Sequence, residues 1–277
     1  MKKIASIIIT LLVILNTSSA QKTYVNINAG YGMPAGSGGM YMYSFQSNAT
    51  TYSTLFYSKN LSLGKGVNSA INLGYMFNKT FGVELGLSYL MGGTTTASIT
   101  NTLNNNFSQQ KISATMYRIV PSFIFVTPTT KYVKAYAKFG AIIGMASVKQ
   151  DYSSTTPSSQ SAAAYSSEQS AKYEGGTALG INSAIGAIYK LGKKLSLSFE
   201  LSNINLSYAP TKYTITKYNV NGVDELATLK TNRIKTNFVE SGSYDFNTKN
   251  VDMPSQSPKT YMPMSSLGIN IGLQIAL

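Results

Sequence analysis

An all-β fold, in which eight antiparallel strands close into an up-and-down barrel that spans a membrane, is the architecture that this sequence of 277 residues predicts. Three observations support it. Apolar residues alternate with small or polar ones along eight segments, each segment is long enough to cross a bilayer, and short and long connections alternate between them. Only 12% of the residues are charged, about half of the roughly 25% that is usual for globular proteins.

The first twenty residues have the layout of a secretory signal peptide. Met1–Lys3 is basic, Ile4–Leu15 is apolar, and Asn16–Ala20 is polar and ends on a small residue suited to cleavage. The apolar run is shorter than the about twenty residues that a membrane-spanning helix needs. We therefore predict a cleaved signal peptide over residues 1–20 and one barrel domain over residues 21–277.

The alternation is clear from the first segment onwards. Val25 and Ile27 alternate with Asn26 and Asn28, and successive side chains of a strand point to opposite faces, so one face is apolar. The other face carries Gly, Ser, Asn and the few charges, as expected for a narrow interior with lipid outside. The predicted strands are Thr23–Met33, Val67–Phe77, Phe81–Met91, Met116–Phe125, Val133–Met145, Thr177–Tyr189, Leu195–Asn203 and Ser265–Leu277.

The connections between these segments differ systematically in length. Three are short and four are long, and in outer-membrane barrels short turns lie on the periplasmic side and long loops on the extracellular side. The short connections are Asn78–Thr80, Val126–Tyr132 and Lys190–Lys194, and the long ones are Pro34–Gly66, Gly92–Thr115, Ala146–Gly176 and Ile204–Met264.

Local signals refine this scheme. Asn221 and Gly222 separate two alternating stretches in the last long connection, which predicts a hairpin above the membrane. A ten-stranded barrel that includes both stretches is the alternative. Ser153–Ser170 is rich in Ser, Ala and Thr and is predicted to be a mobile loop. Pro121 lies inside a predicted strand, where it removes a ladder donor, so we expect a bulge or weakened pairing there.

Aromatic residues fall at the ends of the predicted strands. Two aromatic belts at the lipid–water boundaries are typical of membrane barrels. We expect Tyr31, Tyr89 and Tyr117 at the outer rim, and Phe77, Phe81, Phe125 and Tyr189 at the inner rim.

The C-terminal segment resembles the signal that the barrel-assembly machinery reads, although that signal more often ends in Phe than in Leu. Together with the signal peptide and the loop pattern, it makes the mature chain similar to the eight-stranded OmpA/OmpX-like outer-membrane β-barrel family. This resemblance implies a protein of the Gram-negative outer membrane that contacts outer-membrane lipid and lipopolysaccharide. The apolar residues of the predicted assembly signal are Ile269, Ile271, Leu273, Ile275 and Leu277.

Five ionisable residues fall within the predicted membrane zone, all on the inward face. Charges in so confined a space should pair, because isolated ones are costly. We favour a salt-bridged core that closes the lumen; a narrow polar path or gate, and a catalytic pair of the two carboxylates, remain open. The five residues are Glu84, Arg118, Lys134, Lys138 and Glu200.

The composition excludes many kinds of site. The chain has no His and no Cys, which excludes Ser–His and Cys–His catalysis, thiol nucleophiles, and zinc or iron sites built on these residues. The known barrel enzymes rely on a catalytic His. We therefore expect no enzyme, no cofactor and no metal. The leading hypothesis is a barrel that anchors surface loops for contacts with envelope or cell-surface proteins. A small-solute or ion porin and a subunit of a secretion or envelope-assembly machine are the alternatives.

The net charge of +13 falls by two when the signal peptide leaves. Nearly half of the remainder lies at the short turns, where anionic lipid headgroups are the expected neighbours. The distribution is not that of a nucleic-acid-binding protein. The lysines at the short turns are Lys79, Lys131, Lys190, Lys193 and Lys194.

Overall fold

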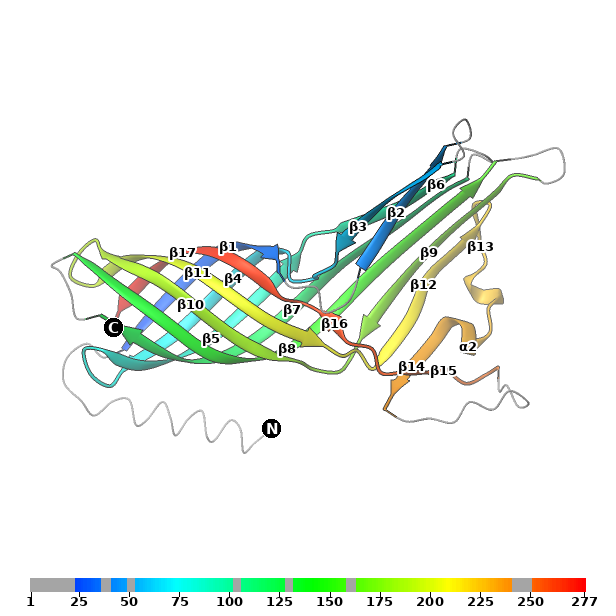
Figure 1. Cartoon of the computed structure of the whole chain (residues 1–277). Coiled ribbons are helices and arrows are strands. Elements are labelled where there is room, and N and C mark those ends of the chain that lie inside the picture. The colour runs from blue at the N-terminus through cyan, green and yellow to red at the C-terminus, as the bar shows by residue number, and fades with distance from the viewer. Residues whose placement is uncertain are drawn as a thin grey trace.

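The computed structural model describes residues 23–35, 41–48, 53–101, 106–127, 132–157, 163–240 and 251–277, and these are mostly strand (Figure 1). The predicted signal peptide, residues 1–20, and Lys131 lie outside these ranges. None of the described helices is long and apolar enough to cross a membrane.

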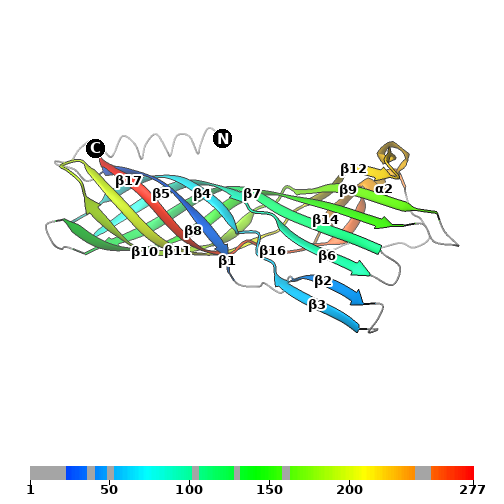
Figure 2. The same cartoon turned by 90° about the horizontal axis from the view of Figure 1, so that it is seen from above.

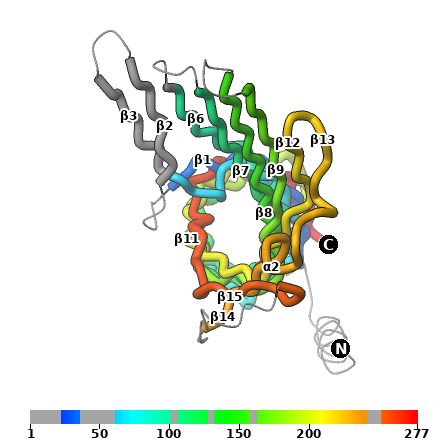
Figure 3. The backbone as a smooth tube through the Cα atoms, turned by 90° about the vertical axis from the view of Figure 1, so that its right-hand side faces the viewer, coloured from blue at the N-terminus to red at the C-terminus, as the bar shows by residue number. Residues whose placement is uncertain are grey.

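Eight antiparallel strands pair in a ring, which Figure 3 shows end-on. The first strand, β1, pairs with β4 and also with the last strand, β17, so the pairing returns to its start. All eight predicted segments are strands of this ring. The ring strands are β1 (Thr23–Pro34), β4 (Gly66–Met76), β5 (Phe81–Gly92), β7 (Asn106–Val126), β8 (Val133–Thr156), β10 (Ala178–Lys190), β11 (Leu195–Tyr208) and β17 (Ser266–Ala276).

Inside and outside are separated by residue parity. Even-numbered side chains of the ring strands point inward and odd-numbered ones outward. This holds around the whole ring, because partners in every ladder have numbers of the same parity. The outward set is apolar and strongly exposed: Phe123 is 71% and Met145 68% accessible. Such a continuous exposed apolar surface suits lipid, not water.

The long connections, predicted as loops, are largely strand in their described parts. β7 and β8 continue beyond the ring as a ladder from Tyr117↔Met145 to Phe107↔Thr155, and further strands add to both sides (Figures 1 and 2). We call this extension, which includes the outer halves of β7 and β8, the outer sheet. Its other strands are β2 (Tyr41–Asn48), β3 (Ser53–Asn60), β6 (Thr95–Asn101), β9 (Tyr165–Glu174), β12 (Lys212–Val220), β13 (Val223–Asp224), β14 (Lys235–Val239) and β15 (Ser255–Pro258).

Ser153–Ser170 is correspondingly not a mobile loop in its described parts. Its beginning belongs to β8 and its end to β9, which pair with each other, while residues 158–162 lie outside the described ranges. A run of Ser and Thr on paired strands can have both faces in water, so its low hydrophobicity does not prevent strand formation.

The hairpin prediction is confirmed. Asn221 (φ 50°) and Gly222 (φ 82°) both adopt the left-handed conformation that a two-residue hairpin turn requires. β12 pairs with β9 and lies outside the ring, so these strands do not extend the ring to ten. The second arm, β13, is only two residues long, and the chain continues through the short helices η1 (Leu226–Thr228) and α2 (Thr231–Ile234).

Pro121 weakens the pairing without a bulge. The β7–β8 ladder has partners at Ile119↔Ile143 and resumes at Ser122↔Gly140 in the same register. Pro121 cannot donate to this ladder. On its other side it still lies opposite Leu85 of β5.

The aromatic side chains gather at both ends of the ring. Tyr89 and Tyr117 are in contact at a centroid distance of 4.8 Å, and Phe81 and Phe125 at 5.3 Å. These outward-facing pairs stand at opposite ends of the same two neighbouring strands, β5 and β7. Their positions match the expected aromatic belts.

Candidate functional site in the lumen

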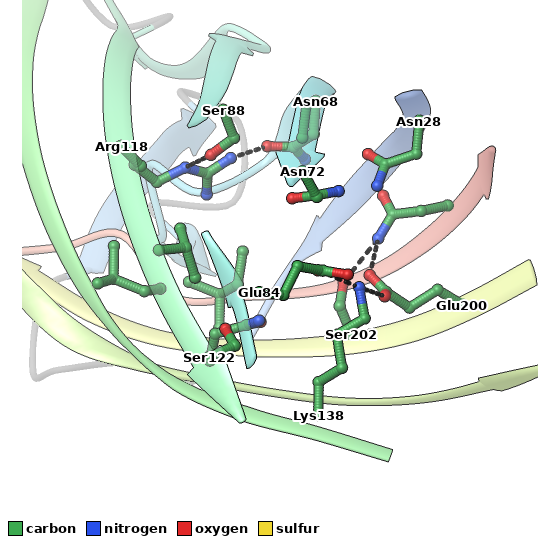
Figure 4. Close-up of a pocket in the computed structure, with 16 residues that line it drawn as sticks. Asn28, Asn68, Asn72, Glu84, Ser88, Arg118, Ser122, Lys138, Glu200 and Ser202 are labelled. Carbon is green, nitrogen blue, oxygen red and sulfur yellow. Dashed lines mark hydrogen bonds and ion pairs between the residues drawn. The ribbon is translucent and has the colours of Figure 1, made fainter. Parts of the chain in front are cut away.

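A buried ion cluster crosses the lumen. Lys138 Nζ on β8 lies 2.8 Å from Glu84 Oε1 on β5 and 2.7 Å from Glu200 Oε2 on β11 (Figure 4). The three side chains are 5%, 4% and 11% exposed. One lysine therefore neutralises part of the charge of two carboxylates that come from widely separated strands.

A tyrosine supports each carboxylate. Tyr24 Oη donates to Glu84 Oε2 at 2.9 Å, and Tyr136 Oη donates to Glu200 Oε2 at 3.1 Å. Asn270 Nδ2 also donates to Glu200 Oε1, at 3.1 Å. Lysine and tyrosine donors to the charged groups strengthen the cluster, because charge-assisted hydrogen bonds are stronger than neutral ones.

A glycine lies between each tyrosine and its glutamate. Tyr24, Gly74 and Glu84 are direct partners across β1, β4 and β5. A Cβ on Gly74 would come within 2.1 Å of Cζ of Tyr24, so the ring needs the space that the glycine leaves. The tyrosine thus reaches over an intervening strand to the carboxylate beyond it.

The same arrangement occurs a second time. Tyr136, Gly186 and Glu200 are direct partners across β8, β10 and β11, four strands further around the ring. The two triplets are therefore on opposite sides of the eight-stranded ring. Lys138 follows Tyr136 by two residues, and Asn26 follows Tyr24 of the other triplet by two residues, so these two positions correspond. Asn26 is also buried, and its Nδ2 donates to Ser198 Oγ at 3.2 Å. We call the two triplets with Lys138 the bulkhead.

The other two ionisable residues of the predicted set lie apart from this cluster. Arg118 is buried and donates through Nε to Ser88 Oγ at 3.1 Å and through its terminal nitrogen to Asn68 Oδ1. No carboxylate of the described residues forms an ion pair with it. Lys134 lines a different cavity at the short-turn end. The structure thus brings together Glu84, Lys138 and Glu200, and leaves Arg118 and Lys134 outside the ion pairs.

The lumen has three levels. Just above the bulkhead is a polar cavity of about 60 Å³, lined by Arg118, Glu84 and several Asn and Ser side chains, with room for only a few waters (Figure 4). At the short-turn end a larger cavity of about 700 Å³, the inner vestibule, begins beside Tyr24. At the outer end an apolar plug fills the ring: Leu61, Leu63, Leu90, Ala97, Ile112, Ala114, Met116, Ile142, Val148, Ala178, Leu206, Tyr208, Met262 and Met264.

Sequence reasoning missed the plug. Leu61 and Leu63 precede β4, and Met262 and Met264 flank Pro263 in and after β16 (Met262–Pro263), all within predicted loops. All four are at most 2% exposed. The signal was present as apolar residues at every second position just before a strand, at Leu61 and Leu63 and again at Met262 and Met264.

The predicted assembly signal lies on β17, between β11 and β1. Its odd-numbered apolar residues Ile269, Ile271, Leu273 and Ile275, with Leu277, are exposed on the outer surface of the ring. Among the described residues no group of three or more His, Cys, Asp or Glu could hold a metal ion.

The outer sheet carries its own polar and aromatic contacts. Tyr173 packs against Tyr213 (4.8 Å between centroids) and stacks on Phe238, and burial together with Tyr213 raises the pKa of Tyr173 to about 12. Burial acts to raise the pKa of Asp151, but the hydrogen bond from Ser170 Oγ (2.6 Å) and the nearby Lys149 outweigh it and lower the pKa. These contacts hold neighbouring strands together above the ring.

The comparisons with known proteins agree with this architecture. The model of the outer membrane protein beta-barrel domain family matches residues 7–239. The chain belongs to this family. A search of the curated proteins gives no match.

One solved structure with some similarity is Ail, the attachment invasion locus protein of Yersinia pestis, in complex with the heparin analogue sucrose octasulfate. Its sequence is 10% identical, the alignment covers 92% of this chain and 99% of that one, and the TM-score is 0.29. The predicted resemblance to outer-membrane barrels is confirmed by the family match.

Proposed function

We propose that this protein is a non-enzymatic anchor of the outer membrane, whose ring closes as an eight-stranded membrane-spanning barrel and whose outer sheet makes contacts at the cell surface. The observation that carries the proposal is the filling of the lumen. The apolar plug and the bulkhead leave about 60 Å³ between them, which is far too little for a solute path. This favours a sealed anchor over a porin.

The outer sheet supports the surface role. It is built on the outer halves of β7 and β8, so two strands of the ring run directly into it. The outward set changes from apolar to polar between the paired residues Tyr117↔Met145 and Thr115↔Ser147, which we take as the outer membrane boundary. Everything beyond this level, including the hairpin at Asn221, would be offered to envelope or cell-surface proteins.

The surroundings follow from the same proposal. The exposed apolar band of the ring would contact outer-membrane lipid and lipopolysaccharide of a Gram-negative bacterium. Residues 1–20 would direct export as a signal peptide, leaving residues 21–277 as the mature barrel domain, and β17 would present Ile269–Leu277 to the barrel-assembly machinery.

Planar-bilayer recording of the purified full chain tests the sealed lumen. We expect no steady unitary conductance. A control variant opens both the plug and the bulkhead through Met262→Gly, Met264→Gly and Lys138→Ala. It should raise the ion conductance if the recording detects pores. Steady, reproducible steps from the unmodified protein would contradict the anchor and support the porin.

Removal of part of the outer sheet tests the surface role. Replacing residues 212–260 by a short turn keeps the whole ring and Met262 of the plug. We expect the variant to keep the heat-dependent gel shift typical of folded barrels and to lose binding of whole cells to surface proteins or host matrix. A variant that only lengthens the turn at Asn221 is the control. Unchanged binding, or co-purification of stable periplasmic partners with both proteins, would favour the envelope-assembly alternative.

A further inference from the structure

The inner vestibule is a large cavity with one sign of charge. It has a volume of about 700 Å³, and no Asp or Glu is among its lining residues. In the described part of the chain, none of its lysines forms an ion pair. The lysines that line it are Lys79, Lys134, Lys190, Lys193 and Lys194.

These lysines face the inside of the ring mouth. Lys134 and Lys190 are even-numbered positions of β8 and β10 and therefore belong to the inward set. The outward positions at this end are aromatic and exposed, as at Phe81 and Tyr189. Four lysines of the short turns thus line this cavity, whereas the sequence suggested headgroups around the rim as their neighbours: Lys79, Lys190, Lys193 and Lys194.

A cluster of unpaired like charges in a narrow cavity calls for a counter-ion. Like charges repel, and a cleft lined by one sign of charge focuses the field and concentrates ions of the opposite sign. In the bulkhead of the same lumen, by contrast, Lys138 is paired with Glu84 and Glu200, where the charges have a structural role. The absence of a carboxylate in the vestibule therefore points to an anion from outside the chain.

The wall of the vestibule also has an apolar part. Met76, Ile124, Val126 and Ile188 line it together with the lysines. Its volume lies within the roughly 300–1,000 Å³ of small-molecule sites. We propose that the inner vestibule binds a phosphate-bearing anion, with the phosphate oxygens on the lysine ammonium groups and any attached apolar chain along this wall. The site lies at the opposite end from the outer sheet, so it goes beyond the proposed function and stands independently of it.

Calorimetric titration of the full chain, folded in an uncharged detergent, tests the site. The probes are inorganic pyrophosphate and water-soluble dihexanoyl phosphatidate, and dihexanoyl phosphatidylcholine is the control for uptake by the micelle. We expect saturable binding of an anionic probe with one site per chain, weakening as salt is raised. Tighter binding of phosphatidate would assign the site to a lipid, and tighter binding of pyrophosphate to a free anion. No saturable binding of either probe would overturn the proposal.

Variants test the lysines themselves. Lys134→Gln with Lys190→Gln should weaken binding at least ten-fold, whereas the matched double change Lys172→Gln with Lys212→Gln on the outer sheet should change it less than two-fold. An equal loss of affinity in both double variants would mean that only the net charge of the protein matters, and it would contradict the proposal. Should the first pair fail to fold by gel shift, Ser196→Glu offers a second route. It adds a carboxylate to the vestibule wall and should weaken binding similarly.

Discussion

The two halves of β7 and β8 form one ladder in two environments. In the inner half the outward residues are apolar, for example Phe123 and Phe139, and they are highly exposed. In the outer half the outward residues become polar, as at Lys111 and Asp151. Backbone pairing is antiparallel and in the same register in both halves, and it is interrupted beside Pro121 in the inner half. The strands therefore form wherever their backbone hydrogen bonds are made. Only the side chains indicate which part lies in lipid.

The halves also differ in where their packing lies. The inner half packs inward, around the bulkhead and the plug, and its outward residues are apolar and exposed, as the proposed contact with lipid requires. The outer half contributes Ile112, Ala114 and Val148 to the plug. Beyond them it is held by contacts between neighbouring strands, such as Ser170 with Asp151. Changes to the inner half should consequently be much more costly.

The largest effect is expected from Lys138→Met. It removes the cation between Glu84 and Glu200 and leaves two buried carboxylates facing each other, and breaking a buried pair in this way costs about 3–5 kcal/mol. Urea unfolding in detergent, followed by circular dichroism because the chain has no Trp, should show this loss. The triple variant that adds Glu84→Gln and Glu200→Gln should recover most of it; no recovery would mean that the cluster contributes packing only.

Leu85→Arg should come next. Leu85 is an exposed outward residue opposite Leu73 and Pro121 in the ring, so the change places a charge on the lipid face at about 2–4 kcal/mol. We expect failure to assemble, measured as loss of the heat-dependent gel shift. Ile99→Arg, an exposed apolar residue of β6 in the outer sheet, is the matched control and should assemble normally. If both variants assemble, the two halves do not differ in environment as described.

Gly74→Ala probes the support of the bulkhead. The new Cβ would come within 2.1 Å of the Tyr24 ring, and overpacking of this kind costs about 1–3 kcal/mol. A lower urea midpoint is expected, and Tyr24→Ala should make the second change at Gly74 nearly neutral. Gly192→Ala serves as control, because nothing lies within 4 Å of its added Cβ. Equal costs at both glycines would show that the tyrosine contact is unimportant.

The smallest effect concerns pH in the outer sheet. The pKa of Asp151 is lowered in the folded state, so its contribution to stability is present above the usual carboxyl pKa and is lost as pH falls through the lowered value. The effect is small because the side chain is partly exposed. The protection factors for amide hydrogen exchange around Ser170, which correct for the intrinsic pH dependence of exchange, should fall on acidification. Asp151→Asn should remove that pH dependence, and a dependence that persists in the variant would assign it to another group.

The sequence was sufficient to predict the strands of the ring. All eight segments were found because lipid outside and a narrow lumen inside impose strict alternation. The strands β7, β8 and β11 extend further from the ring at their outer ends than predicted. The outer sheet was missed because many of its strand positions are polar. Polar strands such as β9 have no hydrophobic period to detect, and their pairing depends on neighbours far along the chain.

The site was predicted in part for similar reasons. Parity placed Glu84 and Glu200 inside, but it could not say which cation would lie between them. That depends on height along the barrel, which the stagger between strands sets, and the stagger brings Lys138 into the cluster and leaves Lys134 in the vestibule. In each Tyr–Gly–Glu triplet the tyrosine precedes its glycine by 50 positions, from Tyr24 to Gly74 and from Tyr136 to Gly186, so no local pattern reveals the triplets.

The shared parity of all ladder partners has a consequence for how such a chain can change in evolution. Inserting one residue into a tight turn, such as Asn78–Thr80, would rotate the whole following strand by half a turn and present Glu84 to the lipid. Inserting two would keep every side chain on its side. The lengths of the short turns in descendants of this gene should therefore vary in even steps, while the hairpins of the outer sheet, which lie beyond the ring, are less restricted.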